Sequence, residues 1–264
     1  MNQHLRLWGA LTALLAAGCN QRPGWSQKPP DGVSGESTLQ GEPLAVRHLS
    51  APTIDGKLDE EAWKTAASTA WFVGPGDGMT PAQHPVAGFA RLGWDDKNLY
   101  LGVVVEDAAP VAPFERDAQD PHLWERSSAI ELMVQPGDFP DNREYFEIQV
   151  DTAGAVFDTS WDGYNQPITG GPDEASKRFG HMEWSTHAER AAYVGKGFYA
   201  IEAAFPWSSF TSSRVAVPPR AGDVWKVNLY TFRDGQRLAL AWSPIRGAGN
   251  FHRSSRWGRV KFVP

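Results

Sequence analysis

The sequence predicts an all-β fold, a single antiparallel β-sandwich of the jelly-roll kind with one or two short helices. Its apolar segments are short and rich in Val, Phe, Tyr and Trp. Clusters of Gly, Pro, Asp and Asn separate these segments, which is typical of sandwiches and barrels. No internal repeat or second linker interrupts residues 46–264, so we expect one domain there.

The N-terminal residues 1–18 are predicted to be a signal peptide. Arg6 precedes a short apolar segment that ends in small residues before Cys19, the only cysteine of the chain. This pattern resembles the bacterial lipoprotein signal, which implies export and a lipid on Cys19. Asn20 lacks the acidic character associated with inner-membrane retention, so we expect an anchor in the outer membrane. An ordinary signal peptide with an incidental cysteine is the alternative.

Residues 19–45 are predicted to be a disordered linker between the lipidated cysteine and the folded module. The segment is rich in Gly, Pro, Ser and Gln and holds few large apolar residues. The folded module is therefore predicted to span residues 46–264.

The module opens with a turn at Asp55-Gly56 and a short helix that carries Trp63. Acidic residues in the first turn of this helix suit the positive end of its dipole. The strands that follow are expected at 86–93, 99–106, 129–135, 145–150, 157–161, 198–205, 224–232, 238–242 and 258–263. A tight hairpin is predicted at 95–98, a helical turn at 206–210 and a long irregular loop at 162–185.

Alternation along two of these strands separates an apolar face from a polar one. Ile130, Leu132 and Val134 share one face of the strand 129–135. Pairing this strand with 145–150 brings Glu131, Glu147 and Gln149 together on the opposite face, because side chains of paired strands align. We expect this polar face to be either plain solvent surface or the floor of a binding cleft.

Several motifs recur in an order and spacing that resemble those of one family. They are Pro52-Thr-Ile-Asp-Gly-x-Leu-x-x-x-x-Trp63, Leu92-Gly-Trp-Asp-Asp-x-x-Leu-Tyr-Leu101, Leu123-Trp-x5-Ile-Glu131, Tyr145-Phe-Glu-Ile-Gln-Val150, Gly154-x-Val-Phe-Asp158, Ile201-Glu-x3-Pro-Trp207, Ala241-Trp-Ser-Pro244 and Phe251-His-x4-Trp-Gly258. The chain resembles family 9 carbohydrate-binding modules across residues 48–263. The resemblance implies a β-sandwich that binds a small saccharide or a polysaccharide end without catalysis.

The resemblance also implies the residues that bind the sugar. Two aromatic rings, Trp124 and Trp242, are expected to enclose one sugar ring. Glu131 supplies the carboxylate, and Glu147 lies on the same face. Gln149 stands where sugar-binding members of the family carry Arg, and this departure supports the alternative of a structural envelope lipoprotein with no sugar ligand.

These residue types suit a sugar for physical reasons. An aromatic ring covers the apolar C–H face of a pyranose, while carboxylate and amide groups satisfy the hydroxyls at its rim. The formal net charge of −6 argues against a nucleic-acid partner.

Three further possibilities remain open at this stage. A haem-binding relative would use the Met and His side chains Met133, Met182, His181 and His252. A glycoside hydrolase would need one carboxyl held protonated in an apolar pocket, and the apparently open sheet suggests no such pocket. Calcium is possible at Asp158, Asp162 and Asn165, whereas no transition-metal motif occurs. We therefore expect a binding protein and not an enzyme.

Overall fold

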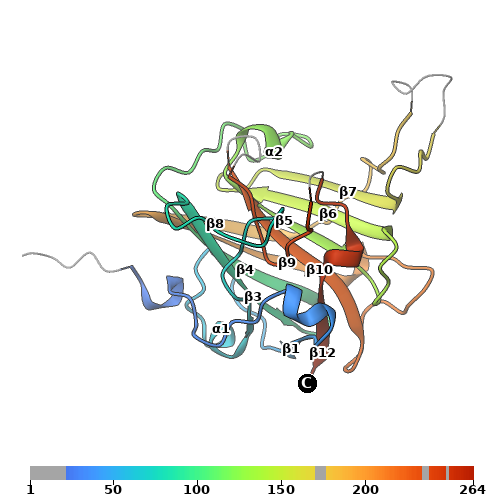
Figure 1. The fold of residues 1–264 in the computed structure, drawn as a ribbon, viewed down its shortest axis with the longest axis horizontal. Helices are drawn as coiled ribbons and strands as arrows, with labels where there is room; N and C mark the ends of the chain where they lie inside the picture. The colour runs from blue at the N-terminus through green and yellow to red at the C-terminus, as the bar shows by residue number, and fades with distance from the viewer. Residues whose placement is uncertain (1–21, 170–176, 234–237, 248–249) are drawn as a thin grey trace, which may run out of the picture.

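A single sheet curls on itself so that its two halves face each other (Figure 1). The computed structural model describes residues 22–169, 177–233, 238–247 and 250–264. The strands run in the order β7-β6-β5-β10-β12-β1-β3-β4-β9-β8, with β11 beside β10 and β2 beside β3. Their bounds are β1 Leu44–His48, β2 Ala67–Ser68, β3 Val86–Trp94, β4 Asn98–Asp107, β5 Ala129–Gln135, β6 Arg143–Asp151, β7 Val156–Gly163, β8 Glu189–Gly195, β9 Phe198–Pro206, β10 Val224–Phe232, β11 Leu240–Ala241 and β12 Gly258–Val263.

The pairing is antiparallel except at β1, which runs parallel to both β12 and β3. The sheet is therefore mixed at this one strand, whereas the sequence predicted a purely antiparallel one. β1 was missed because it crosses residue 45, where the sequence analysis ended the linker and began the module. The partly exposed edge strand β8 was missed as well.

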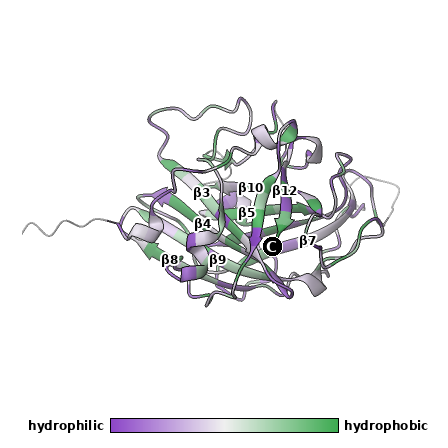
Figure 2. Cartoon of the chain, turned by 90° about the horizontal axis from the view of Figure 1, so that it is seen from below, coloured by the Kyte–Doolittle hydropathy of each residue, from purple (hydrophilic) through white to green (hydrophobic). Residues whose placement is uncertain are grey.

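The main core fills the space between the half of the sheet that contains β5, β6 and β7 and the half that contains β3, β4, β8 and β9. Ile130, Leu132 and Val134 of β5 contribute to it from one half. Val103 of β4 and Ile201 of β9 contribute from the other half. Figure 2 shows hydrophobic residues concentrated on the strands in the middle of the molecule. This layered packing confirms the predicted sandwich class.

Each half-sheet also buries part of its outer face under a short helix. The helix α1 (Glu61–Thr65) covers the β4–β9 half, where Trp63 packs in a second apolar cluster with Phe89. The helix α2 (Leu123–Arg126) covers the β5–β7 half, where a third cluster includes Leu123 and Tyr145. The predicted acidic helix with its Trp is thus confirmed. None of the helices in the described part of the chain is both long and apolar enough to cross a membrane.

The opening turn is fixed by one buried carboxylate. Glu202 Oε2 accepts hydrogen bonds from the backbone N–H groups of Asp55 (2.9 Å) and Gly56 (3.0 Å). Its Oε1 accepts one from the Trp63 indole at 2.7 Å. Gly56 has a φ of +92°, and a Cβ there would meet the backbone carbon of Ala192 at 2.6 Å. Only glycine fits this turn.

The linker prediction is wrong for the described residues from 22 onward. The 3₁₀ turn η1 (Gly24–Ser26) places Trp25 with its ring centroid 5.8 Å from those of Tyr193 and Phe198. A second 3₁₀ turn, η2 (Glu36–Leu39), buries Thr38 completely. The segment packs because these few residues find matching pockets on the sheet, which a polar composition does not reveal. The predicted signal and Cys19 lie outside the described residues.

Candidate functional site

A cavity of about 490 Å³ lies over the outer face of β5, β6 and β7. Its volume is within the range of small-molecule sites, roughly 300–1,000 Å³. The residues that line it are His122, Trp124, Glu131, Glu147, Gln149, Phe157, Trp161, Gly180, Met182, Asn250, Phe251 and His252. Four of the five residues that the sequence predicted for a sugar site therefore lie together.

The floor of the cavity is the polar face that alternation predicted. Glu131 of β5 lies directly opposite Gln149 of β6, and Glu147 lies opposite Met133. Ile130, on the other face of β5, belongs to the main core. Of the two expectations for this face, the structure supports the cleft floor, since loops and α2 cover it and leave Glu131 only 1% exposed.

One amide group joins the two carboxylates of the floor. Gln149 Nε2 donates to Glu131 Oε2 at 2.9 Å and to Glu147 Oε1 at 3.0 Å. The Trp161 indole donates to Glu147 Oε2 at 3.2 Å. Glu131 Oε1 and Gln149 Oε1 are buried without a hydrogen-bond partner. Buried polar atoms usually have partners, so these two acceptors mark a place for a ligand or for water.

Burial changes the acidity of both carboxyl groups. Burial, and next the charge of Glu147, raise the pKa of Glu131 well above its usual value, while the Gln149 hydrogen bond opposes the shift. Burial raises the pKa of Glu147 to about 7, against the hydrogen bonds from Trp161 and Gln149. The expectation that these groups lie on an open sheet was therefore wrong, because Leu123 of α2 and the distant residues Ile245, Phe251 and Trp257 cover that face.

Trp124 is positioned by α2 and by two neighbouring rings. It stacks on His122 with ring centroids 4.4 Å apart and meets Phe157 edge-on at 4.8 Å. Its side chain is partly exposed and lines the cavity. Trp124 is therefore available to a ligand, as its position before Glu131 suggested.

Trp242 is not in the cavity, and the prediction of a Trp124–Trp242 pair is wrong. Trp242 is 1% exposed in the main core, where its indole donates to Val33 O at 2.8 Å. Its neighbour Ala241 belongs instead to the cluster on the cavity side. Trp242 directly follows β11. Side chains alternate between the two faces of the sheet, so Trp242 points into the main core like Leu240, while Ala241 between them points toward the cavity side.

Trp161 supplies a second indole to the cavity and was missed. It lies nearly parallel to Tyr145, with ring centroids 5.8 Å apart and planes inclined by 4°. Phe157 and Trp161 lie four residues apart on the same face of β7, opposite Gln149 and Tyr145 of β6. Continuing the alternation from β6 to the next strand would have identified this residue.

The segment that returns over the cavity carries His252 and Phe251. His252 Nδ1 lies 2.7 Å from the Tyr145 hydroxyl, so this histidine takes part in a structural hydrogen bond. Burial lowers the pKa of His252 to about 4. Phe251 stacks on Tyr230 with centroids 4.0 Å apart and closes the side of the cavity.

The residues considered for haem and calcium have other partners. His181 interacts with both Asp162 and Glu183, and Met133 is fully buried. Asp158 accepts hydrogen bonds from Thr186 and Ser185. Within the described residues, no group of three or more His, Cys, Asp or Glu side chains is arranged to hold a metal ion. A calcium site at Asp158, Asp162 and Asn165 stays a prediction from the sequence.

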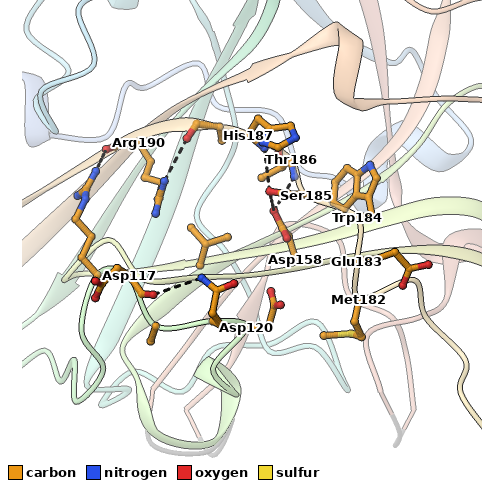
Figure 3. A pocket seen from close by; sticks show the side chains of 15 residues that line it. Asp117, Asp120, Asp158, Met182, Glu183, Trp184, Ser185, Thr186, His187 and Arg190 are labelled. Atoms are coloured by element: carbon orange, nitrogen blue, oxygen red, sulfur yellow. Dashed lines mark hydrogen bonds between the residues drawn. The ribbon is translucent and has the colours of Figure 1, made fainter.

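A second hollow of about 360 Å³ lies on the far side of β7, around Asp158 (Figure 3). Its lining is mostly polar, from Asp117 and Asp120 to Arg190. Trp184 borders it, but the indole of this residue donates to Ser209 O and packs against Phe146. Thr186 Oγ1 is buried there without a hydrogen-bond partner. The hollow nevertheless lacks the pair of unpartnered acceptors between two indole rings that the first cavity has.

A family model for "Carbohydrate family 9 binding domain-like" proteins matches residues 54–263. The chain belongs to this family. The resemblance inferred from the motifs is thereby confirmed. A curated relative, the exoglucanase XynX of Acetivibrio thermocellus, is 26% identical to this family 9 chain over 174 residues. The match covers 64% of the chain but only 13% of that relative's length.

Solved structures share the fold of this family 9 chain. A putative carbohydrate-binding protein from Bacteroides uniformis superimposes with a TM-score of 0.59 and 17% identity, covering 83% of this chain and 97% of the other. A family 9 carbohydrate-binding module from Caldicellulosiruptor kristjanssonii in complex with cellotriose gives 0.53 and 14%, covering 83% and 93%. The same organism's module in complex with glucose gives 0.52 and 14%, covering 83% and 95%. At these identities the likeness establishes the fold alone.

Proposed function

We propose that this chain is a non-catalytic saccharide-binding module whose ligand occupies the cavity over β5–β7. Trp124 and Trp161 provide ring faces for the C–H surface of a sugar. Glu131, Glu147 and Gln149 provide hydrogen-bonding groups for its hydroxyls. The observation that carries the proposal is the pair of buried, unpartnered oxygens, Glu131 Oε1 and Gln149 Oε1, at the floor of an aromatic-lined cavity.

The chemistry of these groups matches a sugar on both of its surfaces. Two acceptor oxygens side by side suit two neighbouring hydroxyl donors. A hydrogen bond to a charged acceptor contributes about 1.5–3 kcal/mol net, so such bonds give orientation as well as affinity. Family membership and the cellotriose and glucose complexes of similar folds support the same ligand class.

Isothermal titration calorimetry with glucose, cellotriose and other soluble saccharides tests this proposal. We expect dissociation constants on the order of micromolar to millimolar, because small sugars stay well hydrated in water. Trp124→Ala should abolish the heat of binding without unfolding the domain. Trp71→Ala is the matched control, since Trp71 is an exposed indole that packs on Phe89 and does not line the cavity.

The outcome of this titration also separates sugar binding from the alternative of a structural envelope lipoprotein. A folded protein that gives no heat with any saccharide would favour the structural role. Equal loss of binding in Trp124→Ala and Trp71→Ala would instead indicate that the ligand contacts another surface.

We further propose that the module is held in the cell envelope by a lipid on Cys19, at the outer membrane. The apolar segment and small residues before Cys19 support this. More than one acyl chain would anchor the protein stably. Labelling cells with a tagged fatty acid should mark the wild-type protein, and Cys19→Ser should remove the label. A label that persists in Cys19→Ser would contradict the anchor.

Glycoside hydrolysis is the second candidate, favoured by the buried carboxyl pair with its raised pKa values. Against it, the Gln149 amide lies between Glu131 and Glu147 and donates to both, so it occupies the space that a scissile bond would need. Release of a chromogenic aglycone that disappears in Glu131→Gln would support catalysis. No release by protein that binds saccharides would support the binding role alone.

A further inference from the structure

The cavity floor holds two carboxyl groups that no cation neutralises. Within the described ranges, neither Glu131 nor Glu147 forms an ion pair with a lysine or arginine. The basic group that approaches them is His252, whose Nε2 lies 3.7 Å from Glu147 Oε2. Burial lowers the pKa of His252 to about 4, so this ring is uncharged at neutral pH. Buried charges are usually paired, and this pair is not.

The donors of Gln149, Trp161, Tyr145 and Tyr230 beside the floor are already used. Both hydrogens of the Gln149 amide go to the two carboxylates. The Tyr230 hydroxyl donates to Phe251 O, and the Tyr145 hydroxyl is bonded to His252 Nδ1. The atoms left over, Glu131 Oε1 and Gln149 Oε1, are both acceptors. With both carboxyl groups ionised, the side chains of the floor therefore offer acceptors and no free donor, so they favour a ligand that brings donors.

The walls of the cavity favour positive charge as well. The indoles of Trp124 and Trp161 line it together with the rings of Phe157 and Phe251. The face of an aromatic ring attracts a cation, by about 0.5–2 kcal/mol depending on solvent exposure. An ammonium group carries three donors and one positive charge, so it meets the requirements of both the floor and the walls.

We propose that the pocket prefers a saccharide unit that carries a free, protonated amine, an amino sugar, over a neutral sugar of the same size. The ammonium group lies against Glu131 Oε1 and Gln149 Oε1 and supplies the charge missing beside Glu147. This inference rests on the proposed saccharide binding and names its ligand class. An N-acetylated amino sugar lacks the charge, and a uronic acid adds a second negative one, so both bind more weakly.

The preference has a pH signature that follows from the groups around the floor. Burial raises the pKa of Glu131 above its usual value and that of Glu147 to about 7, and His252 stays neutral. Binding of an ammonium group stabilises the ionised carboxylates and so releases protons from them. Affinity for the amino sugar rises as the pH increases toward 7 and falls again where the amine itself loses its proton. Affinity for a neutral sugar should not fall in this higher pH range, because a neutral sugar has no amine to deprotonate.

Calorimetry with three matched trisaccharides tests the proposal: the free-amine glucosamine trimer, its fully N-acetylated form and cellotriose. At neutral pH we expect the free-amine trimer to bind at least about tenfold more tightly than cellotriose, which corresponds to about 1.4 kcal/mol. Glu131→Gln should weaken binding of the free-amine trimer by a much larger factor than binding of cellotriose, so that the preference is lost. Because the protein is acidic overall, Glu125→Gln is the control. Glu125 is an exposed carboxylate next to Trp124, and its removal subtracts the same charge outside the cavity.

The outcomes separate this inference from the proposed function. If cellotriose binds as tightly as the free-amine trimer, the amino-sugar preference is overturned while saccharide binding stands. If Glu125→Gln lowers the preference as much as Glu131→Gln does, the attraction is a general effect of the acidic surface, and the inference is likewise overturned. If none of the trisaccharides binds to the folded protein, the proposed function itself fails.

Discussion

The two outer faces of the curled sheet each bury a glutamate, and the two glutamates have opposite surroundings. On the β4–β9 half, Glu202 lies under α1 and accepts three hydrogen bonds, from two backbone N–H groups and one indole. On the β5–β7 half, Glu131 lies under α2 and accepts one, from Gln149. One face is sealed around its carboxylate, whereas the other leaves an acceptor oxygen at the floor of a cavity.

The comparison teaches that burial alone does not identify a functional carboxylate. Burial raises the pKa of Glu202 to about 7 and that of Glu131 well above its usual value. What distinguishes the two groups is the unfilled hydrogen-bonding capacity of Glu131. A satisfied carboxylate holds a turn in place, whereas an unsatisfied one beside a cavity and free ring faces is available to a ligand.

Glu202→Ala tests the structural side of the comparison and should have the largest effect. It leaves three N–H donors without an acceptor, of which those of Gly56 and Trp63 are buried. Each buried loss costs about 1–3 kcal/mol, and the partly buried Asp55 N–H adds a smaller cost, so we expect a destabilisation of about 5 kcal/mol. Urea unfolding followed by tryptophan fluorescence measures it. A loss below about 1 kcal/mol would show that water replaces the carboxylate and that the turn does not depend on it.

The tryptophans Trp242 and Trp124 offer a second contrast of the same kind. Trp242→Ala removes a fully buried core side chain and should cost about 4 kcal/mol. Trp124→Ala removes a partly exposed side chain and should cost about 1 kcal/mol, while binding of saccharide is lost. Thermal unfolding of both variants with and without saccharide measures the two effects. Saccharide binding that survives in Trp124→Ala but disappears in a folded Trp242→Ala would reverse the assignment.

The pH dependence of stability should show the cost of the unpaired carboxyl groups. The folded-state pKa of Glu147 is raised to about 7. Its contribution to stability is therefore fully present below the unfolded pKa of about 4.3 and is lost as the pH rises through about 7, by roughly 3–4 kcal/mol. Glu147→Gln should flatten this part of the profile, measured by urea unfolding at a series of pH values. An unchanged profile in the variant would place the titration elsewhere, for instance at Glu202.

The smallest effect is expected at the contact between the N-terminal segment, which carries Glu36, and the C-terminal residues Arg246 and Arg256. Glu36 accepts hydrogen bonds from Arg246 and Arg256, and these pairs are partly exposed. Arg246→Ala should lower stability only slightly, because solvent screens exposed ion pairs. Limited proteolysis of the segment before residue 44 provides the measurement. Rapid cleavage of wild-type protein in this segment would restore the linker interpretation.

The parts of the structure that depend on local pattern were predictable from the sequence. Period-two alternation gave the two faces of β5 and β6, and hence the grouping of Glu131, Glu147 and Gln149. Turn residues gave the hairpin between β3 and β4.

The parts that depend on distant contacts were not predictable. The packing of Trp25 on Phe198 joins residues far apart in the chain, and composition indicated a linker instead. The closure of the cavity depends on residues 250–257 folding over β6, which no local pattern reports. Trp242 was misplaced because one residue of register reverses the face of a strand.

The most direct test of the central claim follows the indole N–H resonances of the ¹⁵N-labelled protein during a saccharide titration. Assignment by single Trp→Phe variants identifies each signal. We predict that the resonances of Trp124 and Trp161 shift in a saturable way, while those of Trp242 and Trp63 stay in place. Saturable shifts confined to indoles outside the cavity, or no shift with any saccharide, would contradict the assignment of the cavity over β5–β7 as the binding site.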